Sequence, residues 1–277
     1  MPKEKKKPMN QTLLSLCAFC CLANVHAAEV NFNLESPHKW SFEWGWNNES
    51  YSKSDIHFKG IDHQFTLHGV RATDTQKTLT PQTLFNTYLN PGKITIPQTN
   101  ARIAYQLNSD TALALNLDHM KYVVSDAQAV IASGQYLQKN YPSVVQQYLS
   151  PAFMHYEHTD GLNVVSFEYE KKYPLNDLPG KLKGHLFALV GVGIVIPKSN
   201  ITMTMLGQVR NDKFHQAGTN LDIAGGLEVD FMKDYFARTT YKVGRINLSD
   251  VVTSARQDKA SQIFNYQEAS LTLGLRF

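Results

Sequence analysis

Four residues with the potential for metal or acid–base chemistry stand close together at positions 155–160. His155, Glu157, His158 and Asp160 carry imidazole and carboxylate groups, which proteins use to bind divalent metals. Their spacing matches no strong metal motif. In an extended chain, alternation separates His155 and Glu157 from His158 and Asp160. We therefore predict ordinary polar residues here, no metal and no cofactor, and keep His158 and Asp160 as weak catalytic candidates.

His119 is a third catalytic candidate. It follows Leu113, Leu115 and Leu117 at a spacing of two, so in a strand it lies on their apolar face, whereas Asp118 lies on the other. A histidine at the edge of an apolar face can extend its polar tip toward phosphate or water. His119 therefore suits contact with a lipid headgroup better than catalysis.

A further group of acids and histidines occurs in the first third of the chain. These residues are close enough in sequence to gather around a metal ion or an anionic lipid headgroup, although their pattern is weaker than that at 155–160. They are Asp55, His57, Asp62, His63 and His68.

The N-terminus has the order of residues that is typical of a secretory signal peptide. Four lysines lie between positions 3 and 7, an apolar run follows from Leu13 to Val25, and small residues stand at Ala27 and Ala28. We predict a signal peptide over residues 1–27, cleaved after Ala27, and a single domain over 28–277. All three cysteines lie within the signal, which excludes disulfides and thiolate sites from the remainder.

The predicted mature chain carries no surplus of positive charge. Residues 1–27 contain four lysines and one glutamate, so 23 basic and 23 acidic residues remain of the 27 and 24 in the whole chain. Nucleic-acid binding requires a basic face to neutralise phosphates. We therefore expect no nucleic-acid partner.

Apolar and polar residues alternate over several segments, as in strands with one apolar face. At the end of the chain, Leu271, Leu273, Leu275 and Phe277 alternate with polar residues or glycine. Near the start, Trp40, Phe42, Trp44 and Trp46 share one face. The remaining strand segments lie at 98–107, 111–124, 165–170, 183–196, 219–231 and 235–247.

The connections between these segments alternate in length. Short turns are expected near 108, 177 and 233, and long loops over 51–97, 125–161, 197–218 and 248–262. This alternation predicts an all-β, antiparallel transmembrane barrel of eight strands with long extracellular loops. Residues 54–73 also alternate and would give ten strands, but we interpret them as a hairpin within the first loop. In the second loop, the tyrosines at 136, 141 and 148 suggest a helical turn.

The final alternating strand that ends on Phe277, together with the export signal, resembles small bacterial outer-membrane β-barrel proteins of the OmpA and OmpX class. The resemblance implies location in the outer membrane of a Gram-negative bacterium and contact with membrane lipid and lipopolysaccharide. It also implies recognition of the last strand by the barrel-assembly machinery. The aromatic residues Trp40, Trp44, Trp46 and Phe277 are expected at the membrane interface.

An eight-stranded barrel is only wide enough to enclose its own side chains. Alternation directs charges of both signs inward, and unpaired burial would cost several kcal/mol each. We therefore predict a packed network of ion pairs in the lumen. Its members are Glu43, Arg102, Asp118, Glu168, Glu170, Glu228, Asp230, Arg238, Lys242, Glu268 and Arg276.

The function expected from this pattern is a structural or binding role in the cell envelope, without catalysis. One alternative is an enzyme that modifies the acyl chains of lipid A, using His119 or the group around His158. The architecture resembles that of lipid A deacylases, but their His-x-Ser element is absent. A narrow channel is a second alternative. A soluble, exported β-sandwich remains the alternative fold.

Overall fold

The computed structural model describes residues 38–75, 80–90, 98–136, 139–175, 182–211 and 213–277. The predicted signal peptide and the expected turn near 177 lie outside these residues. Most of the described residues belong to one antiparallel sheet. None of the described helices is long and apolar enough to cross a membrane.

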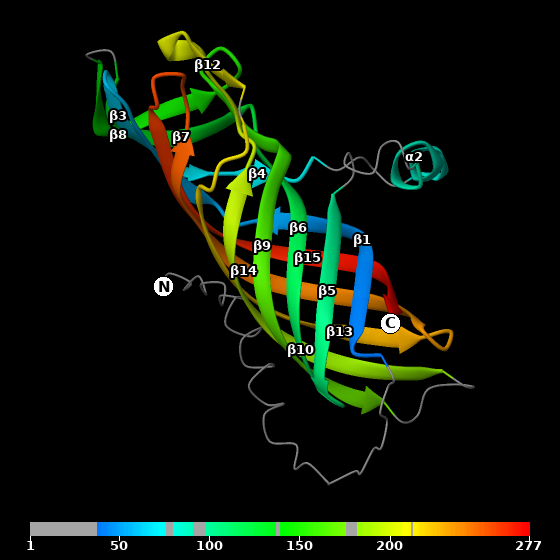
Figure 1. Ribbon diagram of the computed structural model, residues 1–277. Coiled ribbons are helices and arrows are strands. Elements are labelled where there is room, and N and C mark those ends of the chain that lie inside the picture. The colour runs from blue at the N-terminus through cyan, green and yellow to red at the C-terminus, as the bar shows by residue number, and fades with distance from the viewer. Residues whose placement is uncertain (1–37, 76–79, 91–97, 137–138, 176–181, 212) are drawn as a thin grey trace, which may run out of the picture. The chain divides into compact units, whose positions relative to one another are not determined.

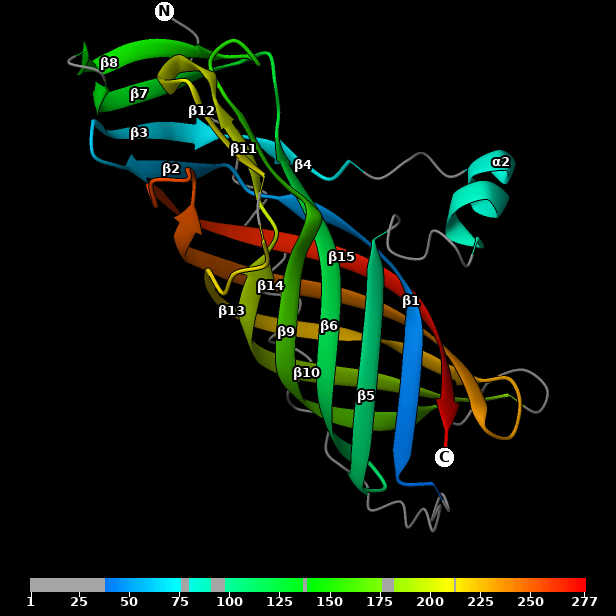
Figure 2. The same ribbon diagram turned by 45° about the horizontal axis from the view of Figure 1, so that its top comes forward.

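Eight strands pair in a closed ring (Figures 1 and 2). The last strand pairs with the first, with Phe42 opposite Leu275, and this pairing closes the barrel. The prediction of eight strands is confirmed. In ring order they are β1 (Trp40–Tyr51), β5 (Thr99–Asn108), β6 (Thr111–Val124), β9 (His155–Leu175), β10 (Lys183–Pro197), β13 (Gly218–Asp230), β14 (Tyr235–Val252) and β15 (Lys259–Arg276).

The long loops form a β-structure that continues the barrel beyond the ring, which we call the loop extension. β2 (Ser54–Lys59) pairs with the start of β15, and the sheet continues through β3 (His63–Val70), β7 (Gln128–Tyr136) and β8 (Lys139–Leu149). The hairpin interpretation of 54–73 is therefore correct. The helical turn expected in the second loop is wrong, because this segment forms β7 and β8, which pair with each other from Gln128 to Tyr136.

The other connections contain shorter elements. β11 (Asn200–Met203) pairs with β9 and with β12 (Gln208–Asn211), and a single 3-10 turn, η4 (Thr204–Leu206), separates β11 from β12. β4 (Ala72–Thr73) pairs with the end of β6. The helical turns α2 (Pro81–Thr83) and η2 (Leu84–Tyr88) lie between β4 and β5.

The outward face of the ring is apolar. Large apolar side chains are exposed there, including Phe42, Ile103, Leu115, Phe167, Val192, Leu221, Ile223, Leu271 and Leu273. We call this set, together with the aromatic residues beside it, the apolar belt. Charged side chains on the same strands, such as Glu43, Arg102 and Glu168, are buried inside the ring. This polarity is the reverse of that in a water-soluble barrel and suits a surface that faces lipid.

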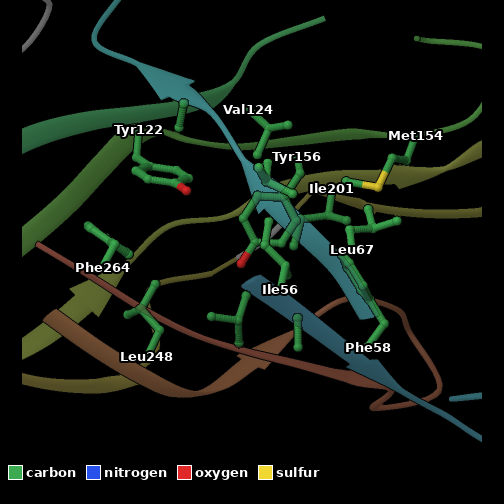
Figure 3. Packing of buried hydrophobic residues seen from close by; sticks show 14 of the residues in the cluster. Ile56, Phe58, Leu67, Tyr122, Val124, Met154, Tyr156, Ile201, Leu248 and Phe264 are labelled. Atoms are coloured by element: carbon green, nitrogen blue, oxygen red, sulfur yellow. The ribbon is translucent and has the colours of Figure 1, made fainter. Parts of the chain in front are cut away.

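Within the loop extension the polarity is the opposite of that in the ring. Figure 3 shows Ile56, Phe58, Leu67, Tyr156 and Ile201 packed together in its interior, and all five are buried. The rings of Phe58 and Phe65 stack with centroids 4.9 Å apart. Burial of apolar side chains at about 25 cal/mol per Å² makes this core the main source of stability for the loop extension.

Two inward glycines make room for aromatic rings from the neighbouring strand. Gly244 lies opposite Tyr266, and Gly274 lies opposite Phe236. A Cβ at Gly244 would lie 2.4 Å from the Tyr266 ring, and one at Gly274 would lie 2.1 Å from the Phe236 ring. Glycine at these positions lets each ring lie flat against the wall of a narrow barrel.

We predict that Leu115→Arg destabilises the barrel by about 2–4 kcal/mol in lipid, the cost of arginine near the middle of a bilayer. Leu115 is 55% exposed and lies between the exposed Ile103 and Phe167. The matched control is Ile61→Arg, because Ile61 is 80% exposed but lies in the β2–β3 turn. That change should alter stability by less than about 0.5 kcal/mol. Urea unfolding in lipid vesicles measures both. Equal losses of unfolding free energy in the two variants would contradict a lipid-facing belt.

Candidate functional site

We call the half of the barrel interior farther from the loop extension the lower lumen, and the half nearer to it the upper lumen. Arg102 is the centre of the charge network in the lower lumen. Its guanidinium binds three carboxylates: Nη1 lies 3.0 Å from Glu43, Nε lies 2.7 Å from Glu168, and Nη2 lies 2.9 Å from Glu170. All four side chains are buried. Glu43 on β1 is directly opposite Arg102 on β5, whereas the other two acids come from β9. A buried guanidinium with three carboxylate partners satisfies most of its donors at once.

Arg238 of β14 extends the network to the other wall. Its guanidinium binds Glu170 and Glu228, the latter at 3.3 Å, and lies 3.5 Å above the ring of Phe187. Glu228 also accepts from Lys172 at 2.8 Å and from Arg276 at 2.7 Å. Arg276 in turn binds Asp230 at 2.7 Å. The lower lumen is thus filled by a continuous chain of ion pairs.

The upper lumen contains more acid than base. Lys242 binds Asp118 at 2.6 Å and lies 3.6 Å from Glu168. Glu268 lies between Lys242 and Glu49 in the sheet register and is buried. In the described structure, neither carboxylate oxygen of Glu268 has a hydrogen-bond partner. Repulsion among buried acids makes this layer the least favourable part of the network electrostatically.

A cavity with an empty volume of about 240 Å³ lies at the junction of the two layers. Much of that volume is narrow gaps between side chains, and only about 10 Å³ is open to the centre of a water molecule, which is room for about one water. Charged and amide groups line it, so it suits water molecules better than an organic substrate. Its lining includes Glu43, Arg102, Glu168, Arg238, Lys242 and Glu268.

His158 lies in the part of β9 beyond the apolar belt, and it is fully buried. Its Nδ1 lies 2.8 Å from the hydroxyl of Ser199, and the rings of Tyr122 and Tyr156 pack against it. Burial lowers the pKa of His158 to about 3, which keeps the ring neutral at ordinary pH. A substrate in solution or in lipid cannot reach this imidazole.

Asp160 lies apart from His158. The interpretation that alternation places both on one face is wrong, because the pairing of β6 with β9 shifts between Met120 and Tyr122. Gly161, with φ at +131°, lies within this bulge. Asp160 is consequently exposed and binds Lys198 at 2.8 Å.

The two remaining members of the 155–160 group bind each other. Nε2 of His155 lies 3.0 Å from the carboxylate of Glu157. Glu157 also accepts a hydrogen bond of 2.8 Å from Asn200. Over the described residues, no three histidine, cysteine or acidic side chains gather in a group able to hold a metal ion.

His119 is partly exposed on the outer wall of β6, at the upper edge of the apolar belt. Its Nδ1 lies 2.7 Å from the amide oxygen of Asn163 on β9. An amide oxygen orients the imidazole but is a weaker partner for a protonated ring than a carboxylate. The geometry is that of a polar boundary residue.

The aromatic residues at the ends of the ring form close pairs. The Trp40 and Tyr105 rings lie 4.9 Å apart, and the Trp44 and Trp46 rings lie 5.1 Å apart. The amide of Phe277 donates to the carbonyl of Trp40 at 2.8 Å. Aromatic pairs at the rim are typical of the interface between lipid and water.

The acids and histidines of residues 55–68 form separate groups in the loop extension. At its tip, Arg256 donates to Asp62 at 2.9 Å, and this hydrogen bond, with a second from His63, lowers the pKa of Asp62 to about 2. The pair joins the β2–β3 turn to the β14–β15 connection. Asp55 and His68 lie together on the outer face of β2 and β3, bonded to each other at 2.8 Å.

A closed ring of eight antiparallel strands with an apolar outer wall and a charged interior defines a transmembrane β-barrel. No family model matches the sequence, and no curated protein matches it. The structure is similar to the Neisserial surface protein A (NspA), at 13% identity over 86% of this chain and 97% of that chain, with a TM-score of 0.34.

Two other solved barrels show a similar degree of likeness. Ail, the attachment invasion locus protein of Yersinia pestis, is 12% identical over 87% of this chain and 99% of that chain, with a TM-score of 0.35. The outer membrane protein AlkL, solved in lipid bilayers, is 10% identical over 92% of this chain and 95% of that chain, with a TM-score of 0.39.

We predict opposite effects for two substitutions in the lumen. Arg102→Met leaves Glu43, Glu168 and Glu170 without their shared cation and should lower the free energy of unfolding by about 3–5 kcal/mol. Glu268→Gln removes one of the crowded negative charges and should leave stability unchanged or raise it. Urea titration of the refolded barrel in lipid vesicles measures both. A large loss for Glu268→Gln would mean that this carboxylate has a favourable partner.

Proposed function

We propose that the protein is a non-conducting outer-membrane barrel with a structural or binding role in the cell envelope. The ring would serve as an anchor, and the loop extension would be the working part on the extracellular side. This proposal rests chiefly on one observation, which is that the interior is filled at two successive levels.

The two levels obstruct passage by different means. In the lower lumen, Arg102 and Arg238 bridge opposite walls through carboxylates. Above it, the apolar core of the loop extension, including Tyr122, Phe264 and Tyr266, occupies the outer end. A solute would have to break the ion pairs and then cross an apolar region. This arrangement favours an anchor over a narrow channel.

The membrane location in this proposal is supported by the apolar belt and its aromatic rim. Trp40, Trp44, Trp46 and Phe277 would contact the interfaces of the bilayer. At the upper edge, His119 and Lys198 are suitably placed for the phosphates of lipopolysaccharide, which is the proposed lipid partner. The final strand, β15, would be the element recognised by the assembly machinery, following export by the signal peptide.

We predict that the folded protein gives no discrete conductance steps in planar bilayers, because ion pairs and the apolar core fill its interior. Folding is verified by heat-modifiable mobility on a gel. Regular conductance steps from the folded barrel would contradict the anchor role and support the channel.

A structural role in the envelope gives a second expected result. A strain that lacks the protein should be more sensitive to detergent than its parent, and the intact gene should restore resistance.

We further predict that lipid A is unaffected by His119 and His158. The first is bonded to an amide and the second is inaccessible. Mass spectra of lipid A should be identical in cells that express the wild type, His119→Ala or no protein. An acyl chain lost with the wild type and retained with His119→Ala would instead support the lipid-modifying enzyme.

A further inference from the structure

Three side chains on the outer face of the loop extension have the connectivity of a nucleophile, a base and an orienting acid. Asp55 comes from β2, His68 from β3 and Ser133 from β7. Nδ1 of His68 lies 2.8 Å from Oδ2 of Asp55, and Nε2 of His68 lies 2.8 Å from Oγ of Ser133. The acid and the hydroxyl thus bind opposite nitrogens of one imidazole, as in hydrolases that use a serine nucleophile.

The hydrogen bonds assign a role to each nitrogen. An ionised carboxylate only accepts, so Nδ1 of His68 must carry the proton that points to Asp55. In the neutral ring, Nε2 is then an acceptor, and the hydroxyl of Ser133 donates to it. This is the tautomer in which the imidazole can remove a proton from serine.

Asp55 is held in its position by a second hydrogen bond. The amide of Gly69 donates to Oδ1 of Asp55 at 2.8 Å, so the two oxygens have different partners. Partial burial raises the pKa of Asp55, but hydrogen bonds from His68 and Gly69 outweigh it, and the net pKa is below the ordinary value. The carboxylate is therefore ionised at neutral pH and able to stabilise a protonated imidazole.

Ser133 and Asp55 both occur at irregularities of the sheet. The β7–β8 register shifts between Ala132 and Gly134, and Ser133 has no partner residue in the described ladder with β8. Gly134 has φ at +107°, and a Cβ there would lie 2.4 Å from the carbonyl oxygen of Gln64. The β2–β3 register shifts between Ser54 and Ile56. The extra residues lie on β3 and β8, so Asp55 and Ser133 each stand opposite a bulge, and bulges are common beside active sites.

The group is accessible, unlike His158. The side chains of His68 and Asp55 are 38% and 49% exposed, and Ser133 is partly exposed. Ile131, opposite His68 in the register, is exposed on the same face and offers an apolar contact next to the hydroxyl. An ester with an apolar acyl group would suit this surface.

We propose that Ser133, His68 and Asp55 form an acyl-transfer site that cleaves water-soluble esters at the cell surface, away from the lipid around the ring. Oγ of Ser133 attacks the ester carbonyl carbon as Nε2 of His68 takes its proton, and the ester C–O bond breaks as that proton passes to the leaving alcohol. Water, deprotonated by His68, then attacks the acyl-serine, releases the carboxylic acid and restores the hydroxyl. No oxidant, reductant or metal is needed.

A neighbouring pair on the same face provides the matched control. Nδ1 of His57 lies 2.6 Å from the hydroxyl of Thr66, and Thr66 lies opposite Ser133 in the β3–β7 register. This pair has the imidazole and the hydroxyl. Asp55 also attracts His57 electrostatically, but the one described hydrogen bond of His57 is to Thr66 and provides no carboxylate to orient the ring. Comparison of the two histidines therefore separates a catalytic arrangement from ordinary hydrogen bonding between strands.

The test uses the full-length barrel, refolded in detergent and treated with a fluorophosphonate probe that labels activated serines. We expect one adduct, which peptide mass spectrometry assigns to Ser133. Ser133→Ala should abolish it. His68→Ala and Asp55→Asn should slow labelling at least tenfold, because the base or its orienting acid is lost. His57→Ala should label at the wild-type rate.

Turnover is measured with p-nitrophenyl butyrate under the same conditions, and heat-modifiable mobility verifies the fold of each variant. Hydrolysis that disappears in Ser133→Ala and falls in His68→Ala supports the site. A folded wild type that neither labels at Ser133 nor hydrolyses the ester overturns the proposal, as does equal labelling in His68→Ala and His57→Ala. These results would leave the anchor role unaffected, since that role depends on the sealed interior.

Discussion

The structure depends on the compensation of charge in an interior that has no room for bulk water. A ring of eight strands directs half of its side chains into a narrow space, and charges buried there without partners would each cost several kcal/mol. Arg102 and Arg238 resolve much of this by sharing carboxylates from β1, β9 and β13. The glycines opposite Tyr266 and Phe236 leave space for rings beside these groups. The same packing that stabilises the wall also closes the lumen.

One strand can serve two opposite environments because the bulge at Gly161 interrupts its alternation only locally, and the same alternation holds on both sides of it. Along β9, Phe167 faces outward and Glu168 inward in the ring, whereas Glu157 is outward and Tyr156 inward in the loop extension. The difference follows from the surroundings, which are lipid around the ring and water around the loop extension. Apolar side chains face the lipid in one part and each other in the next. The protein thus contains two interiors of opposite polarity in series.

The alternation of residues in the ring was sufficient to predict eight strands from the sequence, because each strand has one continuous apolar face. The same alternation directs Lys172 and Asp222 inward, and these two charges, although they were not predicted, also lie in the lumen. Glu49 was missed because the apolar alternation that marks this strand stops at Trp46, whereas β1 continues to Tyr51. The strands of the second loop were missed because alanine, serine and glycine dilute the pattern over 128–136.

Contacts between residues far apart in the chain could not be predicted from the sequence. Ser133 is 65 residues from His68 and belongs to no local motif, so only the β3–β7 register brings them together. The bulge at Gly161, which turns Asp160 outward, likewise has no reliable signal in a single sequence.

β15 belongs to both parts of the molecule. It pairs with β1 in the ring and with β2 in the loop extension, and it lies alongside β14 for most of its length. Tension applied to the tip would pass along this strand directly into the wall of the barrel. Because β14 and β15 are joined to each other at the tip, tension there draws both strands in one direction, and their pairings with β13 and β1 are loaded in shear. The attachment is therefore strongest against mechanical force in the direction in which the barrel emerges from the membrane.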